Sequence, residues 1–288
     1  MIMTVVKEII LNDGNRIPEI GFGTYKATNG DGYKVVLDAI RAGYRLLDSA
    51  KVYENEEDVG RAIKESNIPR EEFFITSKLD RNMMGYDTTR SEFENTLKRL
   101  GMDYIDLYLL HWPRADYGSA EFDDWRRLDI ESWRALEELQ KEGKIRSIGV
   151  SNFLPHHLQN LLEHTDIVPA VNQLELHPGY MQPYVCEFCR KKGIQLEAWS
   201  PIGRGRLNDN VILKELAAKY NTSIQHLCLV FGHQEGIIVL PKSTNYERMK
   251  ENLILDDIVI SEEDMWRIRT MPQVGWGGEH PDCERVYF

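Results

Sequence analysis

The sequence has few cysteines and no long apolar run. Four cysteines in 288 residues are too few for a disulfide framework. No apolar stretch approaches the roughly 20 residues that a membrane-spanning helix needs. The first residues, MIMTVVKEIILNDGN, include Lys7 and Glu8 within their short apolar stretch and show no small-residue cleavage site, unlike a signal peptide. We therefore expect a cytoplasmic protein without a membrane partner.

The sequence has no excess of basic residues, since 46 acidic residues outnumber 35 lysines and arginines. The formal net charge is −11, whereas nucleic acids and anionic membranes are bound through a basic surface. The chain has no linker rich in proline or serine and no shift in composition, so we expect a single domain over residues 1–288. Its one CxxC, CEFC at 186–189, has no Cys/His cluster beside it to complete four ligands, so we expect two helical residues and no metal.

What the sequence does contain is a repeated alternation of strand-like and helical segments. Short apolar or β-branched runs occupy residues 19–24, 45–50, 73–79, 104–112, 145–153, 167–176, 194–201 and 236–243. Helical patterns follow them, with residues 208–221 in the seventh unit. Strands that alternate with helices pair in parallel through right-handed crossovers, and eight such units in about 250 residues fit a (β/α)8 TIM barrel.

Two further features bear on this α/β fold. The turn signal NDGNR near the start predicts an N-terminal β-hairpin before the barrel. An open, doubly wound sheet is the alternative to the barrel, and it usually carries a glycine-rich dinucleotide fingerprint after its first strand. GFGTYK at 21–26 lacks the third glycine of that fingerprint, so the barrel is favoured.

Polar residues close nearly every strand-like run. In a (β/α)8 barrel the C-terminal ends of all strands meet at one mouth, where catalytic residues lie. Any one polar residue after a strand is weak evidence, but a repeated series predicts a common site. The residues in question are Thr24, Asp48, Lys78, His111, Ser151, Asn152, Gln173, Glu175, Ser200, Lys242 and Ser243.

The types of these residues narrow the chemistry. No histidine motif supplies metal ligands, and Ser151 has no nucleophile-elbow context. Asp48 and Glu175 could form the carboxylate pair of a glycosidase, but that reaction leaves Lys78 and Tyr53 without a role. An acid–base site built on Tyr53 explains more, because a nearby lysine cation lowers the pKa of a tyrosine and an aspartate keeps that lysine charged.

The motifs that surround these residues resemble those of the aldo-keto reductase superfamily over essentially the whole chain. They are GYRLLDSAKVYENEEDVG (43–60), TSKL (76–79), IDLYLLHWP (105–113), IGVSNF (148–153), VNQLELHP (171–178), AWSPIGRG (198–205) and LPKSTNYERMKEN (240–252). The resemblance implies that Asp48, Tyr53, Lys78 and His111 form the catalytic set. It also implies NADPH (NADP+) as the cofactor, bound across the barrel mouth without a dinucleotide-binding domain of the doubly wound type.

The same resemblance assigns the remaining site residues. Ser151, Asn152 and Gln173 would hold the nicotinamide carboxamide, Trp199 would stack on its ring, and Lys242, Ser243 and Arg248 would bind the 2′-phosphate. Glu251 and Asn252 match contacts to adenine, and Thr24, Ser200, Ile202 and Gly203 complete the cofactor set. Tyr25, Val52 and Trp112 match positions that line the substrate pocket.

The expected activity is reduction of aldehydes and ketones to alcohols, including α-dicarbonyls, keto acids and sugar-derived carbonyls, by a monomer whose partner is a small-molecule carbonyl compound. The alternative is a non-catalytic subunit that binds NADPH.

The C-terminal tail is short, and Trp276 with Tyr287–Phe288 either closes over the pocket or packs against the barrel. His156 and His157 read as exposed residues at the start of a helix.

Overall fold

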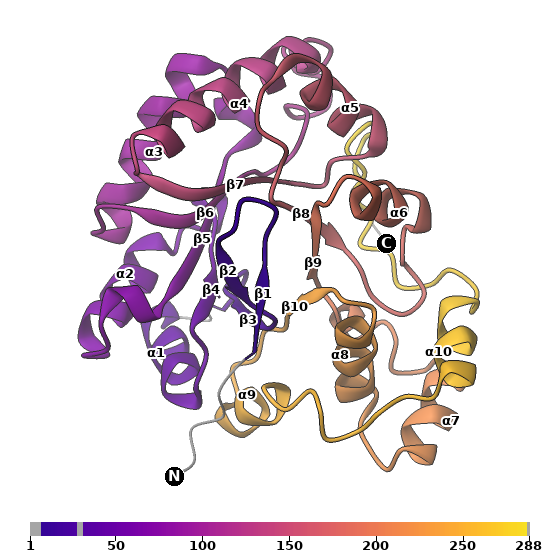
Figure 1. Cartoon of the computed structure of the whole chain (residues 1–288). Helices are drawn as coiled ribbons and strands as arrows, with labels where there is room; N and C mark the ends of the chain where they lie inside the picture. The colour runs from indigo at the N-terminus through magenta and orange to yellow at the C-terminus, as the bar shows by residue number, and fades with distance from the viewer. Residues whose placement is uncertain (1–6, 28–30, 287–288) are drawn as a thin grey trace.

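Eight parallel strands form a closed ring in the computed structural model, which describes residues 7–27 and 31–286. Neighbouring strands follow sequence order, and an isolated parallel bridge between Ile20 and Val239 joins the last strand to the first. This closure confirms the predicted (β/α)8 barrel (Figure 1). The strands are β3 (Gly21–Gly23), β4 (Leu46–Asp48), β5 (Phe74–Leu79), β6 (Ile105–Leu110), β7 (Ile145–Ser151), β8 (Val171–Glu175), β9 (Gln195–Trp199) and β10 (Ile238–Leu240).

The observed strands are shorter than the runs that predicted them. The run over 167–176 gives only Val171–Glu175, and the run over 236–243 gives only Ile238–Leu240. The outer residues of these runs leave the hydrogen-bonded ladder and enter the loops at either end of the barrel. Many predicted site residues therefore stand just beyond a strand rather than within it.

Helices surround the ring of strands, and in the described chain at least one follows each strand (Figure 1). Apart from α8 (Ile224–Gln234), they bury their apolar faces against the outer side of the barrel, in the largest apolar cluster of the described residues. Most of the buried side chains of α8 belong to a second apolar cluster. These helices are α1 (Gly32–Ala42), α2 (Glu56–Glu65), α3 (Tyr86–Leu100), α4 (Trp125–Lys141), α5 (Pro155–His164), α6 (Pro183–Lys191), α8 (Ile224–Gln234) and α9 (Tyr246–Asn252).

The seventh unit differs from the prediction. Residues 208–221 do contain a helix, α7 (Val211–Lys219), but the helix that leads into β10 is α8, which the sequence pattern did not reveal. Ser223 caps α8 by accepting from the backbone N–H of His226, and most of the helix is buried. Helix α7 instead packs with α8 and α10 (Glu262–Arg269) in a separate apolar cluster at the side of the barrel.

Alternation along the strands divides the barrel interior into layers. Side chains two residues apart on a strand share a face, so Leu46 and Asp48 both point inward from β4. Leu46 belongs to an apolar layer with Phe74, Leu107 and Ile238. Closer to the C-terminal ends of the strands, the inward positions become polar. The interior is therefore apolar at its base and polar beneath the mouth.

The predicted N-terminal hairpin closes the base of the barrel. Strands β1 (Glu8–Ile10) and β2 (Arg16–Pro18) pair antiparallel, and Figure 1 shows them across the end of the barrel. Leu11 and Ile17 of this hairpin pack into the apolar inner layer. The Asn15 side chain donates to the backbone carbonyl of Arg146 at 3.0 Å and so ties the hairpin to the start of β7. With this end closed, the interior opens only at the opposite mouth.

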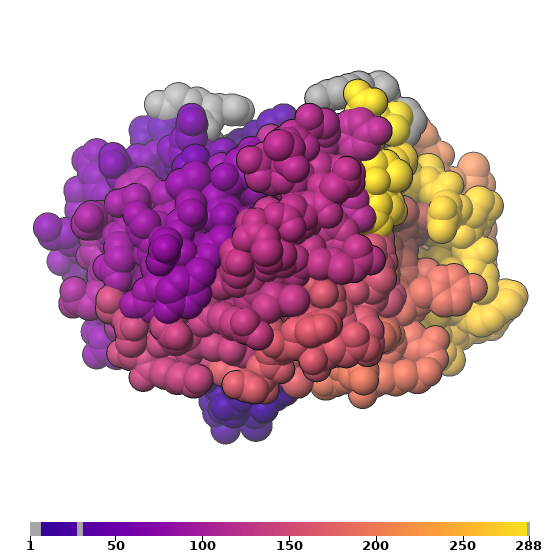
Figure 2. Space-filling model, turned by 90° about the horizontal axis from the view of Figure 1, so that it is seen from above, coloured from indigo at the N-terminus to yellow at the C-terminus, as the bar shows by residue number. Residues whose placement is uncertain are grey.

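After α10 the chain returns across the molecule to the mouth. In Figure 2 this C-terminal segment, in yellow, lies against the middle part of the chain, in magenta. Ion pairs fix the contact: Arg114 reaches Asp282 at 3.1 Å, and Arg81 lies 4.0 Å from Glu279. Within the described part of the chain, no helix has the length and apolar character needed to cross a membrane.

Candidate functional site

A buried ion pair lies at the centre of the barrel near its mouth. Lys78 on β5 is fully buried, and its ammonium lies 2.7 and 2.8 Å from the two carboxylate oxygens of Asp48 on β4. The same nitrogen donates to the backbone carbonyl of Ser49 at 2.8 Å. Burial lowers the pKa of Lys78, but the neighbouring Asp48 and Tyr53 more than offset this and the net pKa is raised. The lysine is therefore charged at neutral pH.

Tyr53 ends the short helix η1 (Lys51–Tyr53), and its hydroxyl oxygen lies 3.4 Å from the Lys78 ammonium. An ammonium can only donate, so the tyrosine oxygen accepts and its own proton is free to point elsewhere. Desolvation raises the pKa of Tyr53 to about 12, although the Lys78 cation lowers it. Lys78 thus acts on this pKa in the expected direction, but withdrawal of the hydroxyl from water has the larger effect. Tyr53 is consequently protonated at neutral pH.

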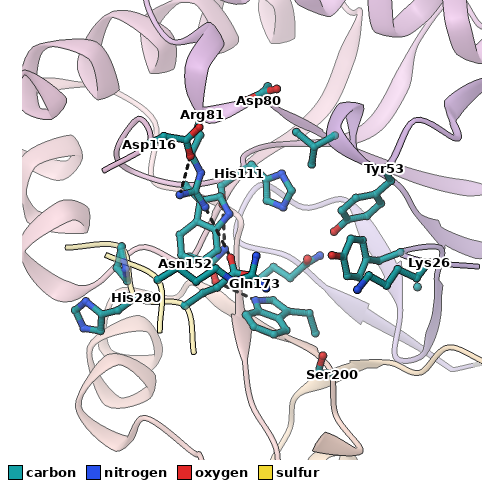
Figure 3. Close-up of a pocket in the computed structure, with 18 of the residues that line it drawn as sticks. Lys26, Tyr53, Asp80, Arg81, His111, Asp116, Asn152, Gln173, Ser200 and His280 are labelled. Carbon is teal, nitrogen blue, oxygen red and sulfur yellow. Dashed lines mark hydrogen bonds and ion pairs between the residues drawn. The ribbon is translucent and has the colours of Figure 1, made fainter. Parts of the chain in front are cut away.

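His111 follows β6 (Ile105–Leu110) directly, and its ring lies edge-on to Tyr53 with 5.8 Å between the ring centroids. Burial, together with the Lys78 and Arg81 cations, holds the pKa of His111 well below its usual range. The imidazole is therefore neutral at physiological pH and carries one N–H donor. In Figure 3, Tyr53 and His111 point into the same part of a cavity.

This cavity occupies the mouth of the barrel and has a volume of about 830 Å³. Asp48, Tyr53 and His111 line it, whereas Lys78 lies beneath them. All three residues predicted to contact substrate also line it: Tyr25, Val52 and Trp112. Trp112 is buried, while Tyr25 and Val52 are about 40% exposed at the rim (37% and 45%).

The predicted cofactor residues divide into two groups. Those that line the cavity are Asn152, Gln173, Trp199, Ser200, Ile202 and Lys242. Those that do not are Thr24, Ser151, Gly203, Ser243, Arg248, Glu251 and Asn252. Thr24 and Ser151 are fully buried; their hydroxyls donate to the backbone carbonyls of Asp48 and Gln173, each at 2.8 Å. Asn252 lies beside the buried Tyr44.

Backbone strain is concentrated at the mouth. Lys26, Asn152, Ser200 and Arg204 all have positive φ although none is glycine, and all four line the cavity. Such conformations cost about 1–3 kcal/mol each and often mark functional sites. Asn152 accepts a hydrogen bond from the indole N–H of Trp199 at 2.9 Å, and this bond fixes the indole at the cavity wall.

Two cations flank the start of α9: Lys242 lines the cavity, and Arg248 lies on the helix itself. Within residues 7–27 and 31–286, neither Lys242 nor Arg248 forms an ion pair, although the acidic chain pairs many of its other cations. Lys250, on the same helix as Arg248, does pair with Glu247 at 2.6 Å. Lys242 and Arg248 are thus available for an anionic group, for which nearby positive charge is required.

Glu175 does not line the cavity with Asp48. Its carboxylate lies 3.2 Å from Arg206 and accepts from the backbone N–H of Gly277 at 2.9 Å, so it holds the C-terminal segment. A glycosidase needs two carboxylates that flank one substrate bond. The geometry does not provide that pair, and the glycosidase interpretation loses its support.

The C-terminal segment forms one wall of the cavity through Glu279–Pro281 and Cys283–Arg285. Trp276 is not part of this wall; it stacks on Tyr180, and Tyr287–Phe288 lie outside the described residues. The prediction that His157 is exposed is wrong. It is fully buried and hydrogen-bonded to Asp282 at 3.0 Å, while His156 is about half exposed (49% of its side chain).

His156, His157 and Asp282 lie close enough together to suggest a metal site. However, Nδ1 of His157 accepts from the backbone N–H of Leu154, so its Nε2 carries the proton that Asp282 receives. Asp282 is also paired with Arg114. The arrangement is a hydrogen-bonded anchor for the tail rather than a vacant set of ligands.

Sequence reasoning did not identify several lining residues, notably Arg81, Tyr117 and Phe122. The Arg81 guanidinium lies over the Trp112 ring, 4.2 Å from its centroid, and 3.5 Å from Asp116. Its position three residues after Lys78, just beyond β5, was a usable signal. Tyr117 and Phe122 lie in a long loop between β6 and α4, where no periodic pattern predicts their direction.

The chain is similar to known proteins over nearly its full length. Residues 19–271 match the Aldo/keto reductase family. Glyoxal reductase of Bacillus subtilis (strain 168) is 44% identical over 281 residues, covering 97% of this chain and 98% of that protein. A solved aldo/keto reductase from Brucella melitensis has a TM-score of 0.84 and 40% identity, covering 92% of this chain and 98% of that one. A Bombyx mori aldo-keto reductase in complex with NADP has a TM-score of 0.83 and 34% identity, covering 91% and 92%.

The buried pair yields a prediction about stability. Lys78→Met leaves Asp48 buried without its cation and should destabilise the protein by about 3–5 kcal/mol. The double variant Lys78→Met/Asp48→Leu removes both charges and should recover at least half of that loss, as measured by urea unfolding. A double variant as unstable as the sum of the two single variants would contradict this account of the pair.

Proposed function

Because the chain belongs to the aldo/keto reductase family, we propose that it reduces small aldehydes and ketones to alcohols with NADPH, and that Tyr53 is the proton donor. The observation that carries this proposal is the arrangement of a protonated tyrosine, a charged lysine and a neutral histidine around one cavity. Members of the family are NADP-dependent oxidoreductases.

The geometry supports a different role for each of these side chains. The nicotinamide cofactor supplies a hydride when it is bound. Tyr53 has its proton directed away from Lys78, so it can pass that proton to a carbonyl oxygen in the cavity. His111 is neutral and can donate a hydrogen bond to the same oxygen. Lys78 then stabilises the tyrosinate that forms, and Asp48 keeps the lysine oriented.

The residues around the cavity fit NADPH. Trp199 presents its ring at the wall, and Gln173 and Asn152 stand beside it. Lys242 and Arg248, which have no carboxylate partner in the described chain, suit a 2′-phosphate, which carries close to two negative charges. Ser243 lies between them in sequence and is half-buried. These features favour NADPH over NADH.

The substrate class follows from the walls of the cavity. Tyr25, Val52, Trp112 and the unpredicted Tyr117 and Phe122 give it a partly aromatic lining. A similar protein is named glyoxal reductase, and another is named glycerol 2-dehydrogenase (NADP(+)). We therefore place α-dicarbonyls such as glyoxal first among the substrates, ahead of keto acids and sugar-derived carbonyls.

A non-catalytic NADPH-binding subunit is the alternative function. The presence of Asp48, Tyr53, Lys78 and His111 in contact or facing one cavity argues against it. The cytoplasmic location and the monomeric state remain our predictions. Cofactor binding without turnover of any carbonyl compound would favour the alternative.

Tyr53→Phe tests the proton donor. The variant removes the transferable proton but keeps the ring, so turnover should fall by a factor of about 100 or more. The dissociation constant for NADPH should stay within about twofold of the wild-type value, because the hydroxyl is not needed to hold the cofactor. Both are measured with glyoxal, by NADPH consumption and by fluorescence titration. Unimpaired turnover would refute the role of Tyr53.

The pH profile follows from the raised pKa of Tyr53. Because the tyrosine keeps its proton up to about pH 12, reduction should be level between about pH 6 and 10. Alcohol oxidation needs tyrosinate and should rise about tenfold per pH unit over the same range. Single-turnover measurements of reduction and of oxidation test this. Tyr53→Phe is the control, in which the oxidation rate should not rise with pH. A reduction rate that falls with a midpoint near neutrality would assign proton donation to another group.

Variants of Lys242 and Arg248 test the choice of cofactor, with a panel of aldehydes, α-dicarbonyls and keto acids as substrates. Lys242→Ala and Arg248→Ala should each raise KM for NADPH about tenfold or more, since a charged hydrogen bond is lost. KM for NADH should stay within about twofold, because NADH has no phosphate to lose contact with. Lys250→Ala, on the same helix but paired with Glu247, is the matched control. Equal losses with both cofactors would contradict the assignment.

A further inference from the structure

A buried carboxylate lies beneath the cavity that the proposed mechanism does not use. Glu197 is the middle residue of β9 (Gln195–Trp199) and is fully buried in the barrel interior. Burying a carboxylate costs several kcal/mol unless it is well paired. Yet within the described residues Glu197 forms no ion pair, and its Oε1 atom has no hydrogen-bond partner. Packing alone does not explain a carboxylate at this position.

Among the described residues, the side chain of Glu197 has one hydrogen bond, which comes from Gln173. The Nε2 atom of Gln173 donates to Glu197 Oε2 at 2.6 Å and to Asp48 Oδ1 at 2.9 Å. Gln173 and Glu197 are register partners on β8 and β9, so the ladder of the sheet holds them side by side. An amide nitrogen has two protons, and here each proton is directed to a different carboxylate.

This bonding fixes the orientation of the Gln173 amide. Rotating it by half a turn would place its oxygen against two carboxylate oxygens, which is repulsive. The amide oxygen is therefore the atom left for the cavity, which Gln173 lines. Three residues were assigned to the nicotinamide carboxamide, and the Gln173 amide oxygen is the one hydrogen-bond acceptor among them that the described contacts leave open. Ser151 donates to a backbone carbonyl, and Asn152 already bonds to Trp199 and His111.

We propose that Glu197 is a positioning residue, which holds the Gln173 amide so that its oxygen accepts from the carboxamide N–H of the nicotinamide. This inference rests on the proposed use of NADPH. Asp48 alone cannot fix the amide in the same way, because it takes only one of the two protons and is also bound to Lys78.

The titratable groups that face Glu197 agree with an acceptor role. They are Asp48 on β4 and Lys78 on β5. The net pKa of the Glu197 carboxyl is raised to about 8: burial and then the Asp48 charge raise it, and the Gln173 hydrogen bond and Lys78 partly offset them. A proton held at neutral pH would then reside on Oε1, and Oε2 would still accept from Gln173.

Binding of NADPH and of 2′,5′-ADP, which lacks the nicotinamide, tests the proposal by titration. Glu197→Met removes the acceptor at similar size and should raise the dissociation constant for NADPH about tenfold. The constant for 2′,5′-ADP should stay within about twofold. Glu197→Gln keeps an acceptor oxygen and should stay within about threefold of the wild-type value for NADPH.

A double-mutant cycle separates positioning from a merely structural role. Gln173→Met should weaken NADPH binding by itself, and adding Glu197→Met should then change nothing further. Additive losses, equal losses for both ligands, no loss in Glu197→Met, or a loss in Glu197→Gln as large as in Glu197→Met would each overturn the proposal. If Glu197→Met does not fold, Glu197→Asp withdraws the carboxylate by one methylene and should give the same loss in the same cycle.

The outcomes also separate this inference from the proposed function. A wild-type protein that binds neither NADPH nor 2′,5′-ADP would refute the proposed function itself. Normal binding of both ligands by the wild-type protein, with unchanged NADPH binding in Glu197→Met, would refute only the role of Glu197.

Discussion

The interior of this barrel is organised by the need to keep one ammonium charged without water. Lys78 is fully buried, and a lysine in that position would lose its proton unless its donors were satisfied. Asp48 and the Ser49 carbonyl take up most of its hydrogen-bonding capacity. The Tyr53 hydroxyl oxygen lies 3.4 Å from the same nitrogen and shares in this bonding at a longer distance, so the tyrosine stands beside the charge that Asp48 holds in place.

Meeting that need requires strands that are distant in sequence. Asp48 ends β4, Lys78 lies on β5, and Gln173 and Glu197 come from β8 and β9 on the other side of the ring. Only a closed barrel turns all four side chains toward one axis. The apolar layer below them and the hairpin at the base keep water from entering from that side, which strengthens every electrostatic contact above.

The sequence predicts the parts of the site that depend on local rules. A polar residue at the end of an apolar run identifies Asp48, Lys78 and His111, because strand ends in a barrel share one mouth. Prediction from the sequence fails where the burial of a side chain depends on partners far away in the chain. His157 is buried because Asp282, 125 residues away, returns to meet it. Helix α8 was missed because IQHLCLVFGHQ is apolar on nearly every side and shows no helical periodicity, as a largely buried helix does.

Glu56 illustrates the same limit within a correctly predicted element. The acidic run after Tyr53 does begin a helix, α2, where the helix dipole favours negative charge. But Glu56 is buried, with Arg99 at 2.6 Å and the Ser77 hydroxyl at 2.5 Å, so it joins α2 to α3 and β5. Because Ser77 adjoins Lys78 on the strand, this contact also fixes the strand that carries the lysine. Ser77 and Lys78 point to opposite faces of β5, so Glu56 braces this strand from outside the barrel while Asp48 holds the lysine within it.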